Sequence, residues 1–373
     1  MNEITINKPF DLIDQWGPYQ VLHIYRPNSG LKAIVVVDNI DRGPAIGGTR
    51  MALDVSLQEC ARLARAMTFK NAAADLPHGG AKSVIFADPA MPAADKELLI
   101  RNFACAIADV ASYIPGPDMG TNEQAMAWIH NEMGRAVGLP RDIGGIPLDE
   151  IGATGLGVAV AAEVAEEFCD VQIEGARIAV QGFGAVGQHA ARFLLRKGAT
   201  LVAASDSRGT LHDASGIEIE QLIAFKKEGN PVIEFDKGSK LTCDEIIGID
   251  CDILIPAARP DVLHKNNVAE LKARLVVQGA NIPATLGAEE IMHQRGILSV
   301  PDFIANAGGV ICASVEYHGG SETSALSTIS EKIERNTRSV LTYSKEKNIL
   351  PRHAAEDIAQ QRVRNATKLR RWS

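Results

Sequence analysis

Two lysines and one aspartate in the first half of the 373-residue chain stand in segments where they could move protons. Lys70 closes an amphipathic stretch, Lys82 follows a glycine pair in HGGAK, and Asp118 lies in the segment GPDMG. A lysine flanked by small residues can enter a cleft, and two ammonium groups held close together would lower each other's pKa. Such a lysine can act as a base. Taken singly, each lysine is better explained as a solvated surface residue.

A glycine-rich segment in the second half has the pattern of a dinucleotide site. Residues 182–187 are GFGAVG, which fits G-x-G-x-x-G between an expected strand and an expected helix. This turn lets the backbone approach a pyrophosphate at the positive end of a helix. An acid at the end of the next strand would accept hydrogen bonds from the adenosine ribose. The candidate cofactor residues here are Gly182, Phe183, Gly184, Ala185, Val186, Gly187, Asp206, Ser207 and Arg208.

The choice between NAD and NADP depends on two neighbouring side chains. Asp206 would repel a 2′-phosphate and so favours NAD, whereas Arg208 could pair with that phosphate. We expect NAD, and NADP stays open.

The elements that must position these residues indicate an α/β protein with two domains. Strands are expected at 19–25, 32–37, 83–86, 178–181, 201–204, 251–255, 274–277 and 297–300, and helices at 56–69, 96–112, 123–134, from 153 onward and at 189–197. Alternating strands and helices predict a Rossmann-type, doubly wound parallel sheet in the second domain. We expect a mixed α/β substrate and oligomerisation domain at 1–145, a nucleotide-binding domain at 146–324, and helices at 325–373 that pack back.

Composition disfavours several classes of protein and partner. The net charge of −8 argues against a nucleic-acid partner, and 46% apolar residues argue against disorder. No uncharged apolar run reaches the roughly 18 residues of a membrane helix. The six cysteines lie scattered without C-x-x-C or zinc spacing, which is typical of reduced thiols in the cytoplasm and predicts no metal site.

Eight segments of the chain, in a fixed order, carry a family resemblance. They are GPAIGGTRM (43–51), MTFKNAAADLPHGGAKSVI (67–85), GPDMGTNEQAMAWI (116–129), ATGLGV (153–158), VQGFGAVGQHAA (180–191), CDILIPAA (251–258), VVQGANIPAT (276–285) and PDFIANAGGV (301–310). On these residues the chain resembles the Glu/Leu/Phe/Val amino-acid dehydrogenases. The resemblance implies reversible oxidative deamination of an L-amino acid by NAD(P)⁺, giving a 2-oxo acid and ammonia, in a homo-oligomer.

The same resemblance implies roles for individual residues. Lys82 would be the catalytic lysine and Asp118 would relay protons to and from the amino nitrogen. Lys70 would hold the substrate α-carboxylate, helped by the backbone. Further positions match the substrate pocket at Gly47, Gly48 and Met67, and the cofactor side at Thr154, Ala257, Asn281 and Asn306.

Substrate specificity is expected to depend on the segment GPAIGGTRM. Family members that act on glutamate carry a lysine at the place of Ile46 and a serine at the place of Ala313. A glutamate side chain buried against Ile46 and Ala313 would lack a partner, which costs several kcal/mol. We therefore expect an apolar or aromatic substrate, as in the leucine/phenylalanine branch, in a pocket enlarged at Gly116 and also lined by Val310. The alternatives are a glutamate dehydrogenase, a hydroxy-acid dehydrogenase on the same fold, and a non-catalytic dinucleotide-binding protein.

Overall fold

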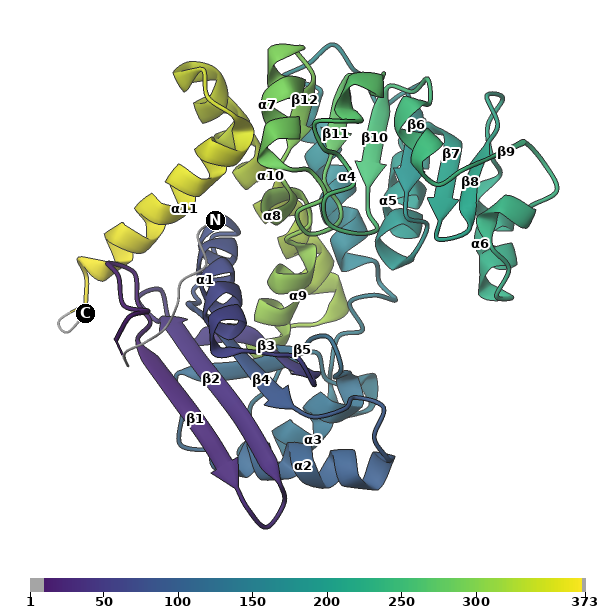
Figure 1. Cartoon of the computed structure of the whole chain (residues 1–373). Coiled ribbons are helices and arrows are strands. Elements are labelled where there is room, and N and C mark those ends of the chain that lie inside the picture. Colours follow the sequence, from purple (N-terminus) through teal and green to yellow (C-terminus); the bar gives the residue numbers. More distant parts are fainter. Residues whose placement is uncertain (1–9, 371–373) are drawn as a thin grey trace. The chain divides into compact units, whose positions relative to one another are not determined.

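The computed structural model describes residues 10–370, which fall into two compact units (Figure 1). The first unit comprises, of the described residues, 10–147, Cys312–Ser324 and 359–370. The second comprises Leu148–Ile311 and Ala325–Ile358. The expected domain boundaries differ, because they placed 312–324 in the nucleotide-binding domain and 325–358 with the substrate domain. Helix α11 (Pro351–Thr367) contributes residues to both units.

Hydrogen bonds explain why 312–324 group with the first unit. This segment includes most of helix α9 (Gly308–Tyr317), whose Glu316 accepts hydrogen bonds from the backbone N–H groups of Leu139 (3.1 Å) and Ile146 (2.8 Å). These contacts join α9 to the glycine- and proline-rich stretch that contains residues 138–147. Helix α10 (Glu322–Lys347) instead pairs Arg338 with Glu167, which belongs to the second unit.

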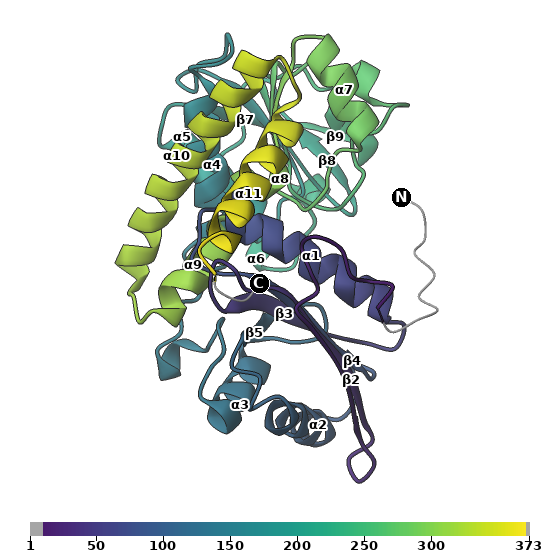
Figure 2. The same cartoon turned by 90° about the vertical axis from the view of Figure 1, so that its left-hand side faces the viewer.

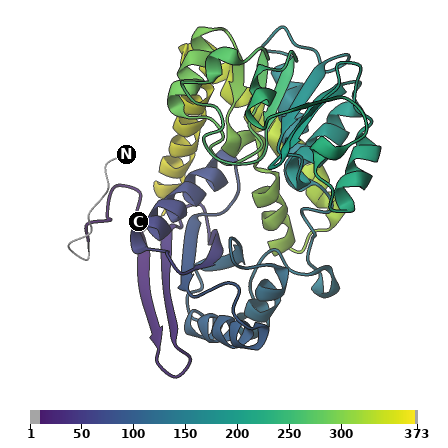
Figure 3. The same cartoon turned by 45° about the vertical axis from the view of Figure 1, so that its right-hand side comes forward.

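The first unit is built on a five-stranded mixed sheet in the order β1-β2-β4-β3-β5. Strands β1 (Gln20–Arg26) and β2 (Leu31–Asn39) form an antiparallel hairpin at one edge (Figure 3). Strand β4 (Gly80–Phe86) is antiparallel to β2, and β3 (Ala45–Ala52) runs parallel to both β4 and β5 (Tyr113–Pro117). Strand β3 therefore lies between the strands that carry or precede Lys82 and Asp118.

Alternation along the strands divides the side chains of this sheet between two faces. Leu31 and Val35 pack with helices α2 (Ala93–Ala106) and α3 (Glu123–Met133), whereas Ile34 and Val36 pack with α1 (Leu57–Ala73). Figure 2 shows α1 on one side of this sheet and α2 and α3 on the other. Val84 of β4 also packs with α1, so Lys82, two residues earlier, faces the same side.

The second unit is built on a seven-stranded sheet in the order β12-β11-β10-β6-β7-β8-β9. The five parallel strands are β6 (Arg177–Gln181), β7 (Thr200–Asp206), β10 (Ile253–Pro256), β11 (Leu275–Val277) and β12 (Leu298–Val300). Strands β8 (Gly209–His212) and β9 (Ser239–Leu241) add antiparallel pairs. The helices of this unit also include α4 (Ala153–Ala165), α5 (Ala185–Leu195), α6 (Ile219–Lys227), α7 (Leu286–Gln294) and α8 (Asp302–Ala305). The expected fold class is confirmed.

Several element boundaries differ from expectation. Strands β3 and β5 were not expected, because their sequences AIGGTRMA and YIPGP contain glycine and proline, which are unfavourable in isolated strands. Helix α5 begins at Ala185 rather than 189, since Gly187 packs in its first turn. Among the described residues, no helix is long and apolar enough to cross a membrane.

Candidate functional site

Lys82 and Asp118 form an ion pair on the face of the first sheet that α1 covers. The Nζ atom of Lys82 lies 2.6 Å from Oδ2 of Asp118. Between them, on β3, is Gly48, where a Cβ atom would stand 2.9 Å from that Nζ and 2.8 Å from the Cβ of Asp118. The two residues can meet across β3 only because this position has no side chain.

Arg50 is a third member of this cluster, and sequence reasoning missed it. Its Nε donates to the same Oδ2 of Asp118 at 3.0 Å, and its Nη1 donates to Oε1 of Glu59 at 2.5 Å. Arg50 lies two residues after Gly48 on β3 and therefore faces the same side of the sheet. The segment GGTRM contained the signal, but only the pairing of β3 with its neighbours shows that Arg50 reaches Asp118.

The electrostatics of the cluster keep Asp118 ionised. Burial raises the pKa of Asp118, but the ammonium group of Lys82 and the guanidinium group of Arg50 outweigh it and hold that pKa below its usual range. Asp118 is therefore a carboxylate at neutral pH and can accept a proton.

Buried hydroxyl groups fix β3 from the opposite face of the sheet. The hydroxyl of Tyr113 donates to the carbonyl of Gly47 (3.1 Å) and lies 2.8 Å from Oγ of Ser83. Ser83 in turn donates to Oγ1 of Thr49 (3.0 Å). Burial raises the pKa of Tyr113, so its hydroxyl stays protonated and these bonds persist. They hold in place the strand that separates Lys82 from Asp118.

Lys70 lies half-buried in the last turn of α1, the helix that covers the face of Lys82. The next residue, Asn71, donates from Nδ2 to the carbonyl of Gly79 (2.7 Å), which ties the end of α1 to the start of β4. Met67 is half-buried one turn earlier. The roles of Lys70 and Met67 towards substrate stay predictions.

An apolar cluster gathers the residues expected to set specificity. It consists of the buried side chains of Ile46, Ile114 and Val137, against which Ala313 packs. A Cβ atom on Gly116 would lie 3.2 Å from Cγ2 of Val137, so this glycine borders the same cluster.

His78 joins the loop before β3 to α9. Its Nδ1 lies 3.0 Å from the carbonyl oxygen of Pro44, and its Nε2 lies 3.0 Å from Oγ of Ser314. A carbonyl can only accept, so Nδ1 carries the hydrogen and Nε2 accepts from Ser314. Burial lowers the pKa of His78 to about 4, so the ring is neutral. The arrangement positions α9, and with it Ala313, beside Ile46.

In the second unit, a cavity of about 590 Å³ surrounds the glycine turn. The candidate residues that line it are Gly182, Phe183, Gly184, Asp206, Ser207 and Ala257. Gly182 has φ +95°, and a Cβ there would lie 2.6 Å from the Cβ of Ala258. A Cβ on Gly184 would meet no heavy atom within 4 Å, so open space adjoins the start of α5. The Phe183 side chain is buried in the core.

Asp206 is held by three hydrogen bonds at the end of β7. Its Oδ2 accepts from Nζ of Lys226 (2.6 Å) and from the backbone N–H of Val232 (2.9 Å), and its Oδ1 accepts from the backbone N–H of Arg208 (2.9 Å). Burial raises the pKa of Asp206, but the bond from Lys226 and the two backbone bonds lower it below its usual range. Lys226, which sequence reasoning missed, therefore neutralises the acid expected to contact the ribose.

The remaining cofactor candidates lie close to one another within the second unit. Nδ2 of Asn306 donates to the carbonyl of Ala280 and to Oδ1 of Asn281, both at 3.1 Å. The buried Oδ1 of Asn306 has no hydrogen-bond partner among the described residues. Thr154 is in the first turn of α4, where its Oγ1 would lie 3.4 Å from a Cβ on Gly309.

These features fit a dinucleotide. Open space beside the N–H groups at the start of α5 suits a pyrophosphate, and the buried acceptor on Asn306 suits an amide donor such as that of nicotinamide. Val186 lies beside Gly279 and Ala257, which connects the glycine turn to the loop that contains Asn281. Val310 is half-buried in this unit, and its part in the substrate pocket stays a prediction.

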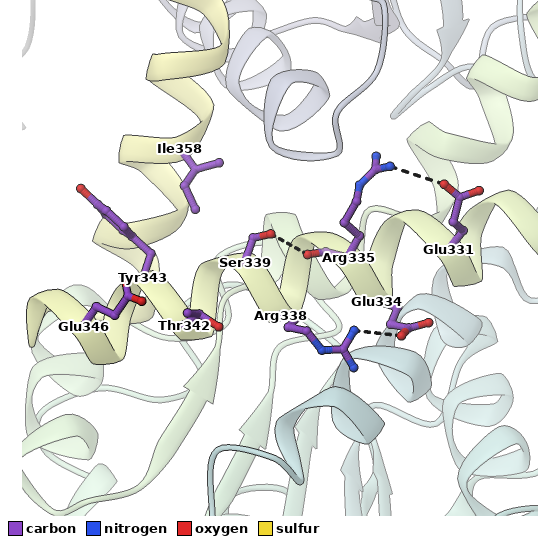
Figure 4. Close-up of a pocket in the computed structure, with 9 residues that line it drawn as sticks. All are labelled: Glu331, Glu334, Arg335, Arg338, Ser339, Thr342, Tyr343, Glu346 and Ile358. Atoms are coloured by element: carbon purple, nitrogen blue, oxygen red, sulfur yellow. Dashed lines mark hydrogen bonds and ion pairs between the residues drawn. The ribbon is translucent and has the colours of Figure 1, made fainter.

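A second cavity of about 600 Å³ lies on α10 and contains none of the predicted site residues (Figure 4). Arg335 pairs with Glu331, and Arg338 pairs with Glu334, each one helical turn away. Such pairs are typical of a solvated helix face. Among the described residues, no group of three side chains that could hold a metal ion is present.

Comparison with known proteins gives consistent matches along the chain. Residues 18–135 match the "Glu/Leu/Phe/Val dehydrogenase, dimerisation domain" family, and residues 144–371 match the "Glutamate/Leucine/Phenylalanine/Valine dehydrogenase" family. A glutamate dehydrogenase of Aeropyrum pernix is 39% identical over 354 residues, covering 88% of this chain and 84% of that protein. An NADP(+)-dependent glutamate dehydrogenase of Pyrobaculum calidifontis is 37% identical over 384 residues, covering 95% and 88%.

Solved structures agree with this fold. Glutamate dehydrogenase from Peptoniphilus asaccharolyticus has a TM-score of 0.84 at 29% identity, covering 95% of this chain and 92% of that chain. L-Tryptophan dehydrogenase from Nostoc punctiforme has a TM-score of 0.75 at 26% identity, covering 94% and 96%.

The fold and the site define a two-domain dinucleotide-dependent dehydrogenase. The chain belongs to the Glu/Leu/Phe/Val dehydrogenase family and is an NAD(P)-dependent amino acid dehydrogenase acting on a CH–NH₂ group. This class excludes the non-catalytic and hydroxy-acid alternatives. The curated relatives named above are glutamate dehydrogenases, not members of the leucine/phenylalanine branch that the pocket residues suggested.

Proposed function

We propose that the enzyme catalyses the reversible oxidative deamination of an apolar or aromatic L-amino acid to a 2-oxo acid and ammonia. The observation that carries the substrate class is the apolar cluster of Ile46, Ile114 and Val137 with Ala313. Burying a carboxylate against these side chains without a cation would cost several kcal/mol.

The charged cluster supplies the acid and base chemistry in this proposal. When bound, NAD(P)⁺ supplies the hydride acceptor. Asp118, a carboxylate at neutral pH, takes a proton from the substrate amino group and later returns it to the departing ammonia. Lys82 holds the developing oxygen of the hydrated intermediate and orients the attacking water. Lys70 pairs with the substrate α-carboxylate.

Glutamate is the second candidate substrate, and overall similarity favours it. The Aeropyrum pernix relative, 39% identical to this chain, is a glutamate dehydrogenase. Identity over a whole chain, however, gives no weight to a single pocket residue, and a solved relative acts on L-tryptophan. We place the local chemistry at Ile46 above the overall similarity because a missing charge partner has a larger effect on specificity than a changed methylene.

A substrate screen that follows NADH absorbance tests this proposal. We expect apolar or aromatic amino acids to give kcat/KM at least about tenfold above that of glutamate. Ile46→Lys supplies the missing cation and should raise glutamate turnover relative to leucine or phenylalanine, whereas the matched control Ile46→Met should not. Glutamate as the best substrate of the unmodified enzyme would overturn the proposal.

We propose NAD as the preferred cofactor and a homo-oligomer as the working state. Asp206 favours NAD, and its pairing with Lys226 leaves room for NADP as well. The family name of residues 18–135 refers to dimerisation, which supports an oligomer of this chain. The cytoplasmic location stays a prediction from the cysteines, all six of which are free.

A further inference from the structure

Ile282 holds a backbone conformation that its side chain disfavours. Its φ is +50°, in the left-handed region that β-branched residues rarely adopt. The side chain is 56% exposed, so packing against the core does not account for this conformation. Backbone hydrogen bonds remain as the cause: the N–H of Ile282 donates to Oδ2 of Asp302 (2.9 Å), and its carbonyl accepts from the N–H of Asp261 (2.9 Å).

Asp302 is itself fixed by a buried ion pair. It is 5% exposed, and its Oδ1 accepts from Nη2 of Arg352 at 2.8 Å. The same guanidinium donates from Nε and Nη2 to Glu289, at 2.6 and 2.9 Å, and lies 5.5 Å above the ring of Phe303. Arg352 thus has two buried acidic partners, of which only Asp302 bonds to Ile282.

Asp302 fixes the orientation of the peptide group that follows Asn281. The N–H that it accepts belongs to the peptide bond between Asn281 and Ile282, so the bond fixes the orientation of that peptide. On the other side, Asn306 donates to the carbonyl of Ala280 and to Oδ1 of Asn281. The segment 280–282 is therefore held from two sides, and neither hold uses the Ile282 side chain.

We propose that Asp302, held in place by Arg352, is a positioning residue that keeps the segment 280–282 in the conformation that binds the cofactor. This inference rests on the proposed cofactor role of Asn281. Without the bond from Asp302, Ile282 relaxes to an ordinary negative φ, and the free enzyme must restore the strained form when the cofactor binds. The strain of one such residue corresponds to roughly a tenfold loss of affinity.

The test compares four variants by direct titration with NADH, followed by fluorescence, and by thermal unfolding. Asp302→Asn leaves a single acceptor oxygen, which pairs with the charged guanidinium of Arg352, so the N–H of Ile282 faces an NH₂ group and loses its acceptor. We therefore expect the Kd for NADH to rise about tenfold. The matched control Glu289→Gln weakens the other buried acidic contact of Arg352, and its Kd should stay within about twofold. Both variants are expected to lose some thermal stability.

The substitution Ile282→Gly should rescue the NADH affinity that Asp302→Asn loses. Glycine adopts positive φ without strain, so Asp302→Asn combined with Ile282→Gly should recover most of that affinity. Ile282→Gly alone is the reference for the double variant and measures what the glycine itself does to the Kd. The KM for the amino acid should change little in any of them. A folded Asp302→Asn with unchanged Kd, an equal loss in Glu289→Gln, or no rescue by Ile282→Gly would each overturn the inference.

The NADH titration requires no amino acid. An enzyme that binds NADH with these differences but oxidises no apolar amino acid would contradict the proposed substrate and leave this inference standing. Turnover of apolar amino acids together with an unchanged Kd for NADH in Asp302→Asn would support the proposed substrate and contradict this inference.

Discussion

Arg50 and Lys82 donate to the same oxygen, Oδ2 of Asp118, at 3.0 and 2.6 Å. The two cations that contact this carboxylate oxygen differ in their other contacts. Arg50 is also bonded to Glu59, so it is anchored on both sides. In the proposed mechanism, Lys82 is the cation that exchanges Asp118 for a substrate oxygen, while Arg50 keeps the carboxylate in place.

Lys82→Ala should remove most of the turnover and leave cofactor binding unchanged. Loss of a positioned acid–base group lowers kcat by about 10²–10⁴-fold, whereas Lys82 and the dinucleotide cavity belong to different compact units. Stopped-flow or steady-state NADH formation measures the first effect and NADH titration the second. Lys96→Ala, which removes a partly exposed lysine of the same unit, is the control and should be fully active. Near-normal turnover in folded Lys82→Ala would refute the assigned role.

Arg50→Met should make the enzyme more sensitive to acid. In the intact cluster, the lowered pKa of Asp118 contributes stability that is present above the unfolded pKa of about 4 and is lost as pH falls through the folded pKa. Removal of Arg50 raises that pKa, so the loss of kcat/KM and of stability on acidification should begin at higher pH. Arg42→Met, which breaks a pair with Asp75 instead, is the matched control. Coincident pH profiles for Arg50→Met and the unmodified enzyme would contradict the assigned electrostatics.

Two alanine substitutions in the glycine turn should have different effects, one on NADH binding and the other on stability. Gly184 has φ −93° and open space at its Cβ, so Gly184→Ala should fold normally but obstruct the pyrophosphate and weaken NADH binding at least about tenfold. A Cβ on Gly187 would lie 2.1 Å from the carbonyl oxygen of Gly182, so Gly187→Ala should lose about 1–3 kcal/mol of unfolding free energy. Thermal unfolding and NADH titration on both variants separate the two effects. Unchanged NADH affinity in folded Gly184→Ala would show that the space beside Gly184 is not a ligand site.

Lys226→Met should shift cofactor use from NADP towards NAD. The Lys226 ammonium neutralises Asp206, and without it the unopposed carboxylate repels a 2′-phosphate. We expect the KM for NADP to rise about tenfold or more while the KM for NAD changes little. Lys227→Met is the matched control, because Lys227 lines the same cavity and Asp206 takes its lysine bond from Lys226. An unchanged ratio of the two KM values would exclude Lys226 from cofactor choice.

The amino-acid pattern predicted the five parallel strands of the second sheet, but it missed the antiparallel strands β8 and β9 of that sheet and strands β3 and β5 of the first. Buried strands such as β6 and β7 are continuous apolar runs followed by a glycine turn, so pattern and structure agree there. Strands β3 and β5 contain GG and PGP, and their stability comes from pairing with β4 and from the Tyr113 hydroxyl rather than from local preference. Local sequence does not encode such pairing.

The same distinction applies to the candidate site. Lys82, Asp118 and the glycine turn lie in segments with a recognisable motif. In the sequence, Arg50 and Lys226 resemble ordinary surface cations. Their pairing with Asp118 and Asp206 becomes visible only when strand register and helix packing are known. Their place in the candidate site depends on contacts between segments far apart in the chain, which a single sequence does not display.

The absence of a side chain at Gly48 predicts which codons a mutational library should tolerate. A single methyl group there would collide with both members of the ion pair, although it alters no charge and no hydrogen-bonding atom. In a saturation library scored by growth or colour, codon 48 should therefore be as intolerant as codons 82 and 118. Codons of exposed charged residues, such as those on the outer side of α10, should accept most replacements.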